Sequence, residues 1–293
     1  MFHVEQPSNN NLFLTCRDHM VSDELFDIVC DSRRSPLRTK VSLDQNYFKR
    51  YYKSDNYISH TDRQETIFKK VYFLSRKMAQ YYKWRLISKY KLAPKTLLDV
   101  GAGVGHFVRS AERRNWKANG VEISAKARSV ANSKHPNSVF PVSHTKNLSK
   151  NSQTIITLWH VLEHIPNLDE QVQELKRLLH QKGRLIVAVP NYKSFDAKYF
   201  GSFWAAYDVP RHLWHFSRQS MTSFFEDHHM VVESVHPMWL DSFYVSLLST
   251  KNKSGKMKIL KGLWIGLLSN LKAIRTKEFS SLIFVIKHKK ATF

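Results

Sequence analysis

The sequence predicts an α/β protein built on a doubly wound, mostly parallel sheet. Within residues 95–235, short apolar segments alternate with amphipathic ones, which is typical of parallel strands covered by helices on both faces. The 293 residues are 42% hydrophobic and include only two cysteines, Cys16 and Cys30, which excludes a disordered chain and a disulfide scaffold. Residues 1–62 lack this alternation. We therefore predict an N-terminal extension over 1–62 and a main domain over 63–293.

The short apolar stretch at residues 25–29 is compatible with a strand. A helix is predicted over 63–91, because side chains recur there at spacings of three and four and Gly and Pro are absent. That stripe comprises Ile67, Val71, Leu74, Met78, Tyr81 and Arg85.

The main domain continues with seven apolar segments that predict the strands of the sheet. They lie at residues 96–100, 118–123, 139–142, 154–159, 184–189, 231–235 and 281–286. Helices are predicted between them at 106–115, in a segment that ends at 131, at 169–179 and at 221–227. Gly183 is expected to end the helix that precedes the fifth strand.

Two segments interrupt the alternation. Residues 191–218 are rich in aromatic side chains and predict a lid over an acceptor site, or alternatively an ordinary packed excursion. Residues 240–278 form a basic insertion before the last strand.

A glycine loop carries the strongest signal for function. Gly101, Gly103 and Gly105 stand between the first strand of the sheet and the next helix, where glycine lets a ligand approach the backbone closely. Glu122 follows the last of them by 17 residues and ends the second strand, where a carboxylate can accept hydrogen bonds from ribose hydroxyls. The usual dinucleotide pattern has its third glycine at the position of His106, so a nicotinamide or flavin cofactor is less favoured. A plain tight turn is the alternative.

This stretch resembles the class I S-adenosylmethionine-dependent methyltransferases, which have a Rossmann-like seven-stranded fold. The resemblance implies S-adenosylmethionine as the cofactor, with the glycine loop around its methionine part, Glu122 on the ribose and Ile123 on the adenine. The implied cofactor residues are Asp99, Gly101, Ala102, Gly103, Gly105, Glu122, Ile123 and Trp159. The sequence departs from many relatives after the third strand, where residues 143–145 offer no acidic side chain for the adenine.

Two further segments, 158–166 and 208–217, resemble the ubiquinone-biosynthesis-type O-methyltransferases. That resemblance implies a small-molecule or lipid-precursor acceptor, methylated at oxygen. An oxygen nucleophile usually needs a base, and His160 at the end of the fourth strand is the first candidate. His212 or His215 is the second, and each histidine has a structural hydrogen-bonding role as its alternative.

The residues from His160 to His164 also match H-x-x-E-H, a zinc peptidase pattern. That chemistry needs both histidines on one continuous helix, but the motif directly follows a strand and Pro166 comes soon after it. Cys16 and Cys30 stand alone in the sequence. We therefore predict no metal site.

The formal charge of +22 leaves open an anionic partner. Residues 251–293 hold 11 basic and one acidic side chain, and 63–95 hold ten and one, so the excess flanks the methyltransferase-like region. The insertion also carries a helical stripe, namely Ile259, Leu260, Leu263, Trp264, Leu267, Leu268 and Leu271. Flanked by the basic residues of 256–277, it is expected to pack against the core or a second subunit, or else to lie on an anionic membrane.

Two other functions stay open at this point. The charge is compatible with an RNA methyltransferase, although no N-P-P-Y-type tetrapeptide follows the fourth strand. A non-catalytic module that binds a membrane or a partner is the third interpretation. Neither a secretion signal nor a spanning segment is evident, so we expect a cytoplasmic location, peripheral to the membrane if the insertion docks there. The oligomeric state and the acceptor are left open.

Overall fold

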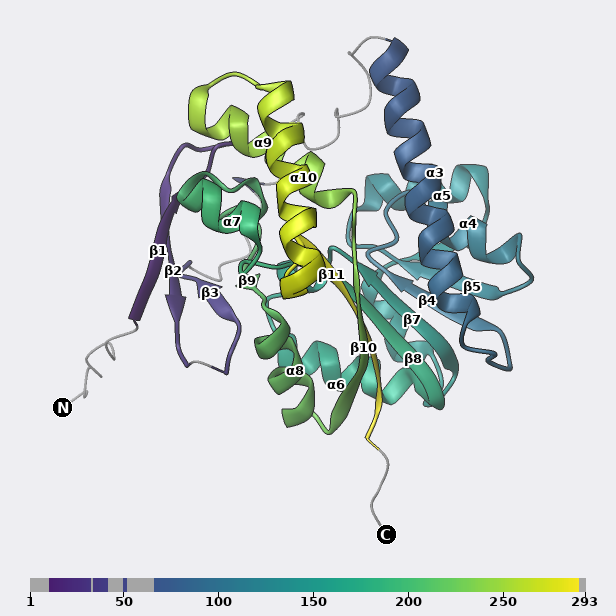
Figure 1. The fold of residues 1–293 in the computed structure, drawn as a ribbon. Coiled ribbons are helices and arrows are strands. Elements are labelled where there is room, and N and C mark those ends of the chain that lie inside the picture. The colour runs from purple at the N-terminus through teal and green to yellow at the C-terminus, as the bar shows by residue number, and fades with distance from the viewer. Residues whose placement is uncertain (1–10, 33, 42–49, 52–65, 290–293) are drawn as a thin grey trace, which may run out of the picture. The chain divides into compact units, whose positions relative to one another are not determined.

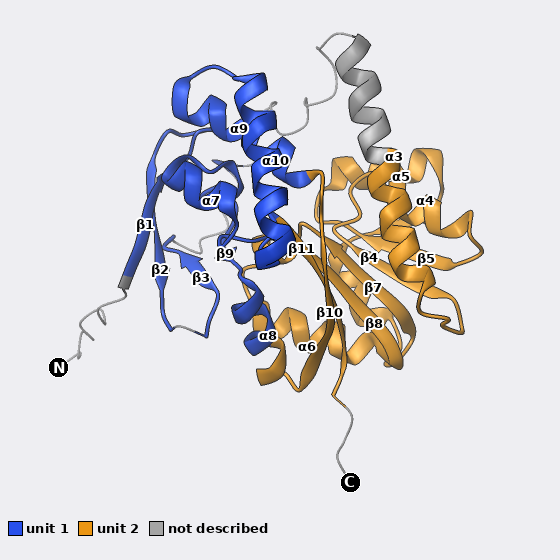
Figure 2. Cartoon of the chain, viewed as in Figure 1, with its two compact units in different colours: residues 1–62, 190–224, 241–280 blue, residues 63–189, 225–240, 281–293 orange. Residues whose placement is uncertain are grey.

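The computed structural model describes residues 11–32, 34–41, 50–51 and 66–289 (Figure 1). The chain divides into two compact units (Figure 2). The first comprises residues 1–62, 190–224 and 241–280, and the second comprises residues 63–189, 225–240 and 281–293. Each unit is thus assembled from segments that lie far apart in the sequence. Much of the predicted extension, including residues 1–10 and 52–62, lies outside the described residues.

The second unit is built on a seven-stranded sheet in the order β10-β11-β8-β7-β4-β5-β6. Its strands are β4 (Thr96–Val100), β5 (Lys117–Val121), β6 (Val139–Phe140), β7 (Gln153–Trp159), β8 (Leu179–Pro190), β10 (Met230–Pro237) and β11 (Ser281–His288). β4 pairs in parallel with β5 and β7, β5 with β6, and β7 with β8, whereas β10 and β11 are antiparallel. This confirms the predicted seven-stranded, mostly parallel sheet.

Helices cover both faces of this sheet. The helices of the unit are α3 (Thr66–Ser88), α4 (His106–Glu112), α5 (Ala125–Lys134) and α6 (Leu168–Leu178), with short 3-10 helices η1 (Val142–Asn147) and η2 (Leu162–His164). Leu97, Ile155 and Ile186 share one core cluster with buried residues of α3 and α4. Successive strand residues point to opposite faces, and the neighbours Leu98 and Ile156 are also fully buried. The second face is therefore covered as well.

The first unit holds a four-stranded sheet in the order β1-β2-β3-β9. Its elements are β1 (Asn11–Arg17), β2 (Leu25–Cys30), β3 (Leu37–Thr39), α7 (Phe195–Phe200), η3 (Gly201–Phe203), η4 (Ala205–Tyr207), β9 (Trp214–His215), α9 (Asp241–Ser254) and α10 (Ile259–Thr276). All three pairings are antiparallel. The remaining helix, α8 (Arg218–Asp227), runs from segment 190–224 into segment 225–240. The strand considered for residues 25–29 is β2.

The aromatic segment 191–218 supplies core residues to the first unit. Phe200, Trp204 and Tyr207 are buried with Phe26 and Ile28 of β2 in a single cluster. Large aromatic side chains bury much apolar surface and account for the density of aromatics in this segment. Their packing matches the alternative interpretation, an ordinary packed excursion, and the lid over an acceptor stays a prediction.

The predicted helical stripe on α3 is wrong where the structure describes its side chains. Met78 and Tyr81 are exposed, whereas Trp84 and Ile87 are buried. The end of the helix is apolar on more than one side, and the side with Trp84 and Ile87 is the one that packs in the core cluster with the strands. The side chains of residues 67–74 lie outside the described ones.

Gly183 does not end a helix as expected. α6 ends at Leu178, and Gly183 lies within β8, at an irregularity in the pairing with β7. A Cβ at this position would approach the carbonyl oxygens of His180 and Thr154 to 2.9 and 3.0 Å. The glycine therefore serves a close backbone approach.

Except for Leu268, which packs against the core cluster of the first unit, the apolar stripe predicted on the basic insertion is exposed. Leu260 and Trp264 are 86% and 58% exposed, and Leu268 is half-buried. The buried face of α10 is formed instead by Gly262, Ile265, Gly266, Ser269, Asn270 and Ala273. Small residues allow two helices to pack closely, so the face that holds them, and not the face with the larger side chains, contacts α9. Among the described helices, none has the length and hydropathy that crossing a bilayer requires.

Candidate active site

The loop between β4 and α4 needs glycine at three positions. Gly101, Gly103 and Gly105 have φ of +72°, +53° and +74°, in the left-handed region that favours glycine. The N–H groups of Gly101 and Ala102 both donate to the carbonyl oxygen of Val121, at 2.8 and 3.1 Å. These bonds tie the loop to the end of β5.

The three glycines differ in what surrounds them. A Cβ at Gly101 would lie 2.3 Å from a methyl carbon of Val161, so this glycine serves internal packing. At Gly103, no described residue other than its two chain neighbours has an atom within 4 Å of an added Cβ. The loop therefore presents open space at Gly103, where a ligand can approach the backbone.

The side chain of Glu122 is hydrogen-bonded to the loop. Its carboxylate accepts hydrogen bonds from the N–H groups of Gly103, at 2.9 Å, and Ser124, at 2.8 Å. A carboxylate has about four acceptor positions, so these bonds leave capacity for hydroxyl donors. The next residue, Ile123, is 86% exposed. The structure thus brings together the loop and the carboxylate that the 17-residue spacing predicts to meet.

Asp99 lies buried near the end of β4. Its carboxyl accepts a 2.6 Å hydrogen bond from the hydroxyl of Thr157 on β7. Burial raises the pKa of Asp99 to about 7, against the opposing effects of the Thr157 hydrogen bond and the positive charge of Lys83. Glu122 adds to the rise through like-charge repulsion. Asp99 is therefore a buried acid whose charge is sensitive to cations nearby.

Lys83 on α3 is a site residue that the sequence reasoning missed. Its ammonium lies 4.0 Å from the centre of the Trp159 ring, a cation–π contact, and it acts electrostatically on Asp99. Trp159 in turn meets Phe107 of α4 edge to face at 5.4 Å. Residues 63–95 contain ten basic side chains, so the sequence gives no signal that singles out Lys83.

Trp159 carries an unusual polar group. Its indole Nε1 is buried and has no acceptor within the part of the chain that the structure describes. Buried donors are nearly always hydrogen-bonded, and an exception needs a reason. This orphaned N–H fits a site that a polar ligand completes.

His160 directly follows β7 and has a left-handed backbone. Its φ is +57°, and its N–H donates to the carbonyl oxygen of Ala188 on β8 at 3.0 Å. Its Nδ1 lies 3.4 Å from Oε1 of Glu163, whose side chain is fully buried while that of His160 is one-third exposed. A buried carboxylate beside an accessible imidazole is an arrangement suited to a general base.

The H-x-x-E-H pattern does not form the helix that zinc peptidases use. His160 precedes η2, and His164 is the last residue of this three-residue 3-10 helix. The two histidines therefore do not lie one turn apart on a continuous α-helix. The expectation of no metal site remains a prediction.

Comparison with known protein families decides the class of this site. The profile of a family described as a methyltransferase domain matches residues 71–235, more than half of the chain. The chain belongs to this methyltransferase family. S-Adenosylmethionine, the cofactor that the sequence resemblance implies, is compatible with the open loop at Gly103 and the orphaned Trp159 N–H.

Solved structures agree with the methyltransferase fold. Geranyl diphosphate C-methyltransferase from Streptomyces coelicolor A3(2) is 16% identical, with a TM-score of 0.51 over 92% of this chain and 95% of that one. A SAM-dependent methyltransferase from Archaeoglobus fulgidus is 14% identical, with a TM-score of 0.50 over 72% of this chain and 94% of that one. At such identities the likeness establishes the fold alone. A comparison with curated proteins finds no match.

The second candidate bases of the methyltransferase belong to the first unit. His212 is buried, and its Nδ1 lies 2.9 Å from the carbonyl oxygen of Ala206. His215 is buried against Thr39, whose hydroxyl lies 2.9 Å from its Nε2. Burial, together with nearby His212, holds the pKa of His215 well below its usual range. His215 is therefore a neutral residue that joins β9 to β3.

The Asp208–Arg211 pair of the methyltransferase forms a buried ion network. Nη2 of Arg211 lies 2.6 Å from Asp208 and 2.8 Å from Asp18. Although burial alone would raise the pKa of Asp18, the hydrogen bond and charge of Arg211 lower it. This network connects the turn after β1 to the aromatic segment, which gives Arg211 a structural role.

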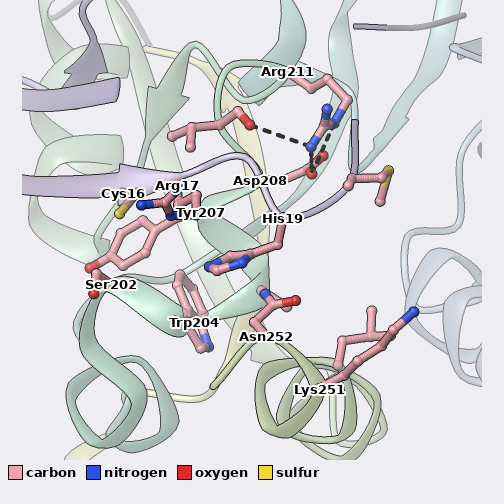
Figure 3. Close-up of a pocket in the computed structure, with 14 residues that line it drawn as sticks. Cys16, Arg17, His19, Ser202, Trp204, Tyr207, Asp208, Arg211, Lys251 and Asn252 are labelled. Atoms are coloured by element: carbon pink, nitrogen blue, oxygen red, sulfur yellow. Dashed lines mark hydrogen bonds and ion pairs between the residues drawn. The ribbon is translucent and has the colours of Figure 1, made fainter. Parts of the chain in front are cut away.

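A cavity of about 390 Å³ lies beside this network in the first unit (Figure 3). Its lining combines basic and aromatic side chains, among them Arg17, His19, Trp204, Tyr207 and Lys251. Cys16 also lines it, and burial raises the pKa of its thiol to about 12, so the thiol stays protonated. Trp204, Tyr207, Asp208 and Arg211 of this lining belong to the aromatic segment 191–218, for which the sequence predicts a lid over an acceptor site.

Proposed function

We propose that the protein transfers a methyl group from S-adenosylmethionine to an oxygen atom of a small-molecule or lipid-precursor acceptor. The observation that carries this proposal is the pair of His160 and Glu163 after β7. An acceptor hydroxyl must lose its proton during methylation, and this pair offers a base for that proton.

In this proposal the residues of the second unit hold the cofactor. Glu122 accepts hydrogen bonds from the ribose hydroxyls, and Ile123 packs on the adenine. The loop from Gly101 to Gly105, with Asp99 beneath it and Ala102 within it, surrounds the methionine part. The open space at Gly103 supports this assignment.

Lys83 and Trp159 complete the methionine end of the proposed site. The carboxylate of methionine is an anion, and the Lys83 ammonium over the Trp159 ring is a cation near the loop strand. The orphaned indole N–H is a donor suited to the same group. A bound carboxylate would be stabilised by both.

The chemistry divides between cofactor and protein. S-Adenosylmethionine supplies a methyl group already activated by the sulfonium, so positioning of the acceptor accounts for much of the rate. His160 takes the hydroxyl proton as the new oxygen–carbon bond forms and the sulfur–carbon bond breaks. Glu163 orients the imidazole and stabilises its protonated form. His212 is the second candidate for the base.

Two glycine variants test the cofactor site. Gly103→Ala places a methyl group in open space, so it destabilises the fold only through the left-handed backbone at this position. Gly255→Ala makes the same change at φ +73°, also in open space, in the turn between α9 and α10. Isothermal titration with S-adenosylmethionine should show at least about 10-fold weaker binding for Gly103→Ala only. Equal affinities for the two variants would contradict the assignment.

The acceptor class is tested by transfer of labelled methyl groups into a cell extract. The extract is then fractionated into small molecules, lipids, RNA and protein. Label in the small-molecule or lipid fraction, in an alkali-stable ether or an oxygen-linked ester, supports the proposal. Label in RNA would instead establish the nucleic-acid alternative. Cofactor binding without transfer to any fraction would favour a non-catalytic module.

A further inference from the structure

Helix α10 exposes a continuous apolar stripe. Its six members are large side chains between 40% and 86% exposed, namely Leu260, Leu263, Trp264, Leu267, Leu271 and Ile274. At about 100° per residue, they fall within an arc of roughly 100° on one side of the helix. Isolated exposed hydrophobics are ordinary, but a contiguous stripe marks an interaction surface.

The stripe is not left over from incomplete packing, because α10 packs through a different face. A Cβ at Gly262 would lie 2.8 Å from the side chain of Leu247, and one at Gly266 would lie 2.8 Å from the Cα of Phe243. α9 and α10 therefore meet in close backbone contact, side by side in Figure 1. The face with these glycines is directed away from the stripe, which leaves six large side chains in water.

The surroundings of the stripe are strongly cationic. Residues 242–277 contain eight basic and no acidic side chains. Lys261, Lys272 and Arg275 are exposed, and their helical spacing places them along one border of the stripe. The turn before α10 adds exposed Lys256 and Lys258.

We propose that this face of α10 docks the protein on an anionic lipid membrane surface. An amphipathic helix with Trp and Leu on one side and lysines beside them binds at the lipid–water interface. The inference goes beyond methyl transfer and does not depend on the acceptor.

The charge pattern favours lipid over other occupants. A second copy of the chain would bring two sets of cations together across an interface without acidic partners. A nucleic acid would neutralise the cations, but it would leave the large aliphatic side chains in water. An anionic bilayer accommodates both the apolar stripe and the basic side chains. The stripe inserts into the lipid–water interface, and the headgroups pair with the cations.

The test uses the full-length protein and two kinds of vesicle in a co-sedimentation assay. One kind consists of phosphatidylcholine alone, and the other also contains about 30% of the anionic lipid phosphatidylglycerol. We expect binding to the anionic vesicles that weakens as salt rises. A basic residue near such a surface contributes about 5-fold in affinity, so Lys261→Gln, Lys272→Gln and Arg275→Gln together should weaken binding about 100-fold.

Matched variants separate the surface from general effects. Arg113→Gln, Lys117→Gln and Lys134→Gln remove the same charge from exposed positions of the second unit and should leave most of the binding. Leu260→Ser with Leu271→Ser should abolish binding, whereas Leu25→Ser with Val130→Ser, also exposed, should not. Circular dichroism and S-adenosylmethionine titration check that every variant is folded.

A depth measurement gives an independent readout. Brominated lipids should quench tryptophan fluorescence in the native protein, and Trp264→Phe should remove most of that quenching while binding persists. An equal loss of vesicle binding in the charge variant of α10 and in its control variant would overturn the proposal. So would a dimer in gel filtration that only the stripe variant disperses, or salt-sensitive RNA binding in place of vesicle binding. Failure to bind S-adenosylmethionine would count against the proposed function and leave this inference standing.

Discussion

His160, the proposed general base, has a left-handed backbone. Its left-handed φ of +57° is uncommon outside glycine, and such strain is concentrated at functional sites. Asparagine tolerates this backbone better than most residues, so His160→Asn removes the imidazole with little change in fold. We expect kcat to fall about 100-fold to 10,000-fold with cofactor affinity retained. Single-turnover kinetics with the identified acceptor would measure this.

Glu163→Gln distinguishes an orienting role from a merely structural one. The amide keeps the size of the buried group but removes its charge beside His160 Nδ1. Protonation of the imidazole is then less favourable, and the acid side of the kcat profile should move to lower pH. An unchanged profile together with a lower melting temperature would assign Glu163 to packing alone.

Asp99 makes stability depend on pH in an unusual direction. Burial raises its pKa to about 7, so between pH of about 4 and 7 the folded state binds a proton that the unfolded chain has lost. The free energy of unfolding contributed by this group therefore falls as pH rises through that window. In Asp99→Asn this contribution disappears. Urea titrations of the cofactor-free protein at pH 5 and pH 8 would measure it.

The exposed Asp227 provides the control for that experiment. Asp227→Asn removes an equal charge from the end of α8 and should leave the difference between pH 5 and pH 8 as in the native protein. The interpretation fails if Asp99→Asn retains the native difference as well.

At the scale of elements, the α9–α10 hairpin depends on glycine more than on leucine. A methyl group at Gly266 would meet the backbone of Phe243 at 2.8 Å, and backbone cannot be displaced cheaply. We expect Gly266→Ala to lower the free energy of unfolding by about 1–3 kcal/mol. Leu260→Ala, at a position 86% exposed, should change it by less than about 0.5 kcal/mol. Thermal unfolding of both variants compares them, and a larger loss for Leu260→Ala would contradict the packing described here.

The same hairpin explains one limit of prediction from sequence. Hydrophobic periodicity selects the most apolar face of a helix, and on α10 that face is the exposed one. The true contact face consists of Gly, Ser, Asn and Ala around Ile265, whose fit depends on distance and not on hydropathy. The strands of the large sheet were predictable because buried parallel strands are apolar throughout their length.

For the whole molecule, the candidate site was predictable where it depends on local chain geometry. Left-handed glycines and an acidic residue one strand later leave a pattern in the sequence, and the structure brings Gly103 and Glu122 within hydrogen-bond distance. Lys83 leaves no such pattern, because its place over Trp159 depends on how α3 packs. The sequence also gives no indication that three distant segments form the first unit. The contact of Arg211 with Asp18, for example, joins residues that lie 193 positions apart.

The order of the large sheet also has a consequence for synthesis of the chain. β11 lies between β10 and β8, so the last of these seven strands along the chain is an interior one. β8 ends at Pro190 and β11 begins at Ser281, a separation of 281 − 190 = 91 residues. At ribosomal rates, the outer edge of β8 waits about 5–20 seconds for its partner. Throughout that interval the nascent chain carries an unpaired apolar edge, the kind of surface on which aggregation begins.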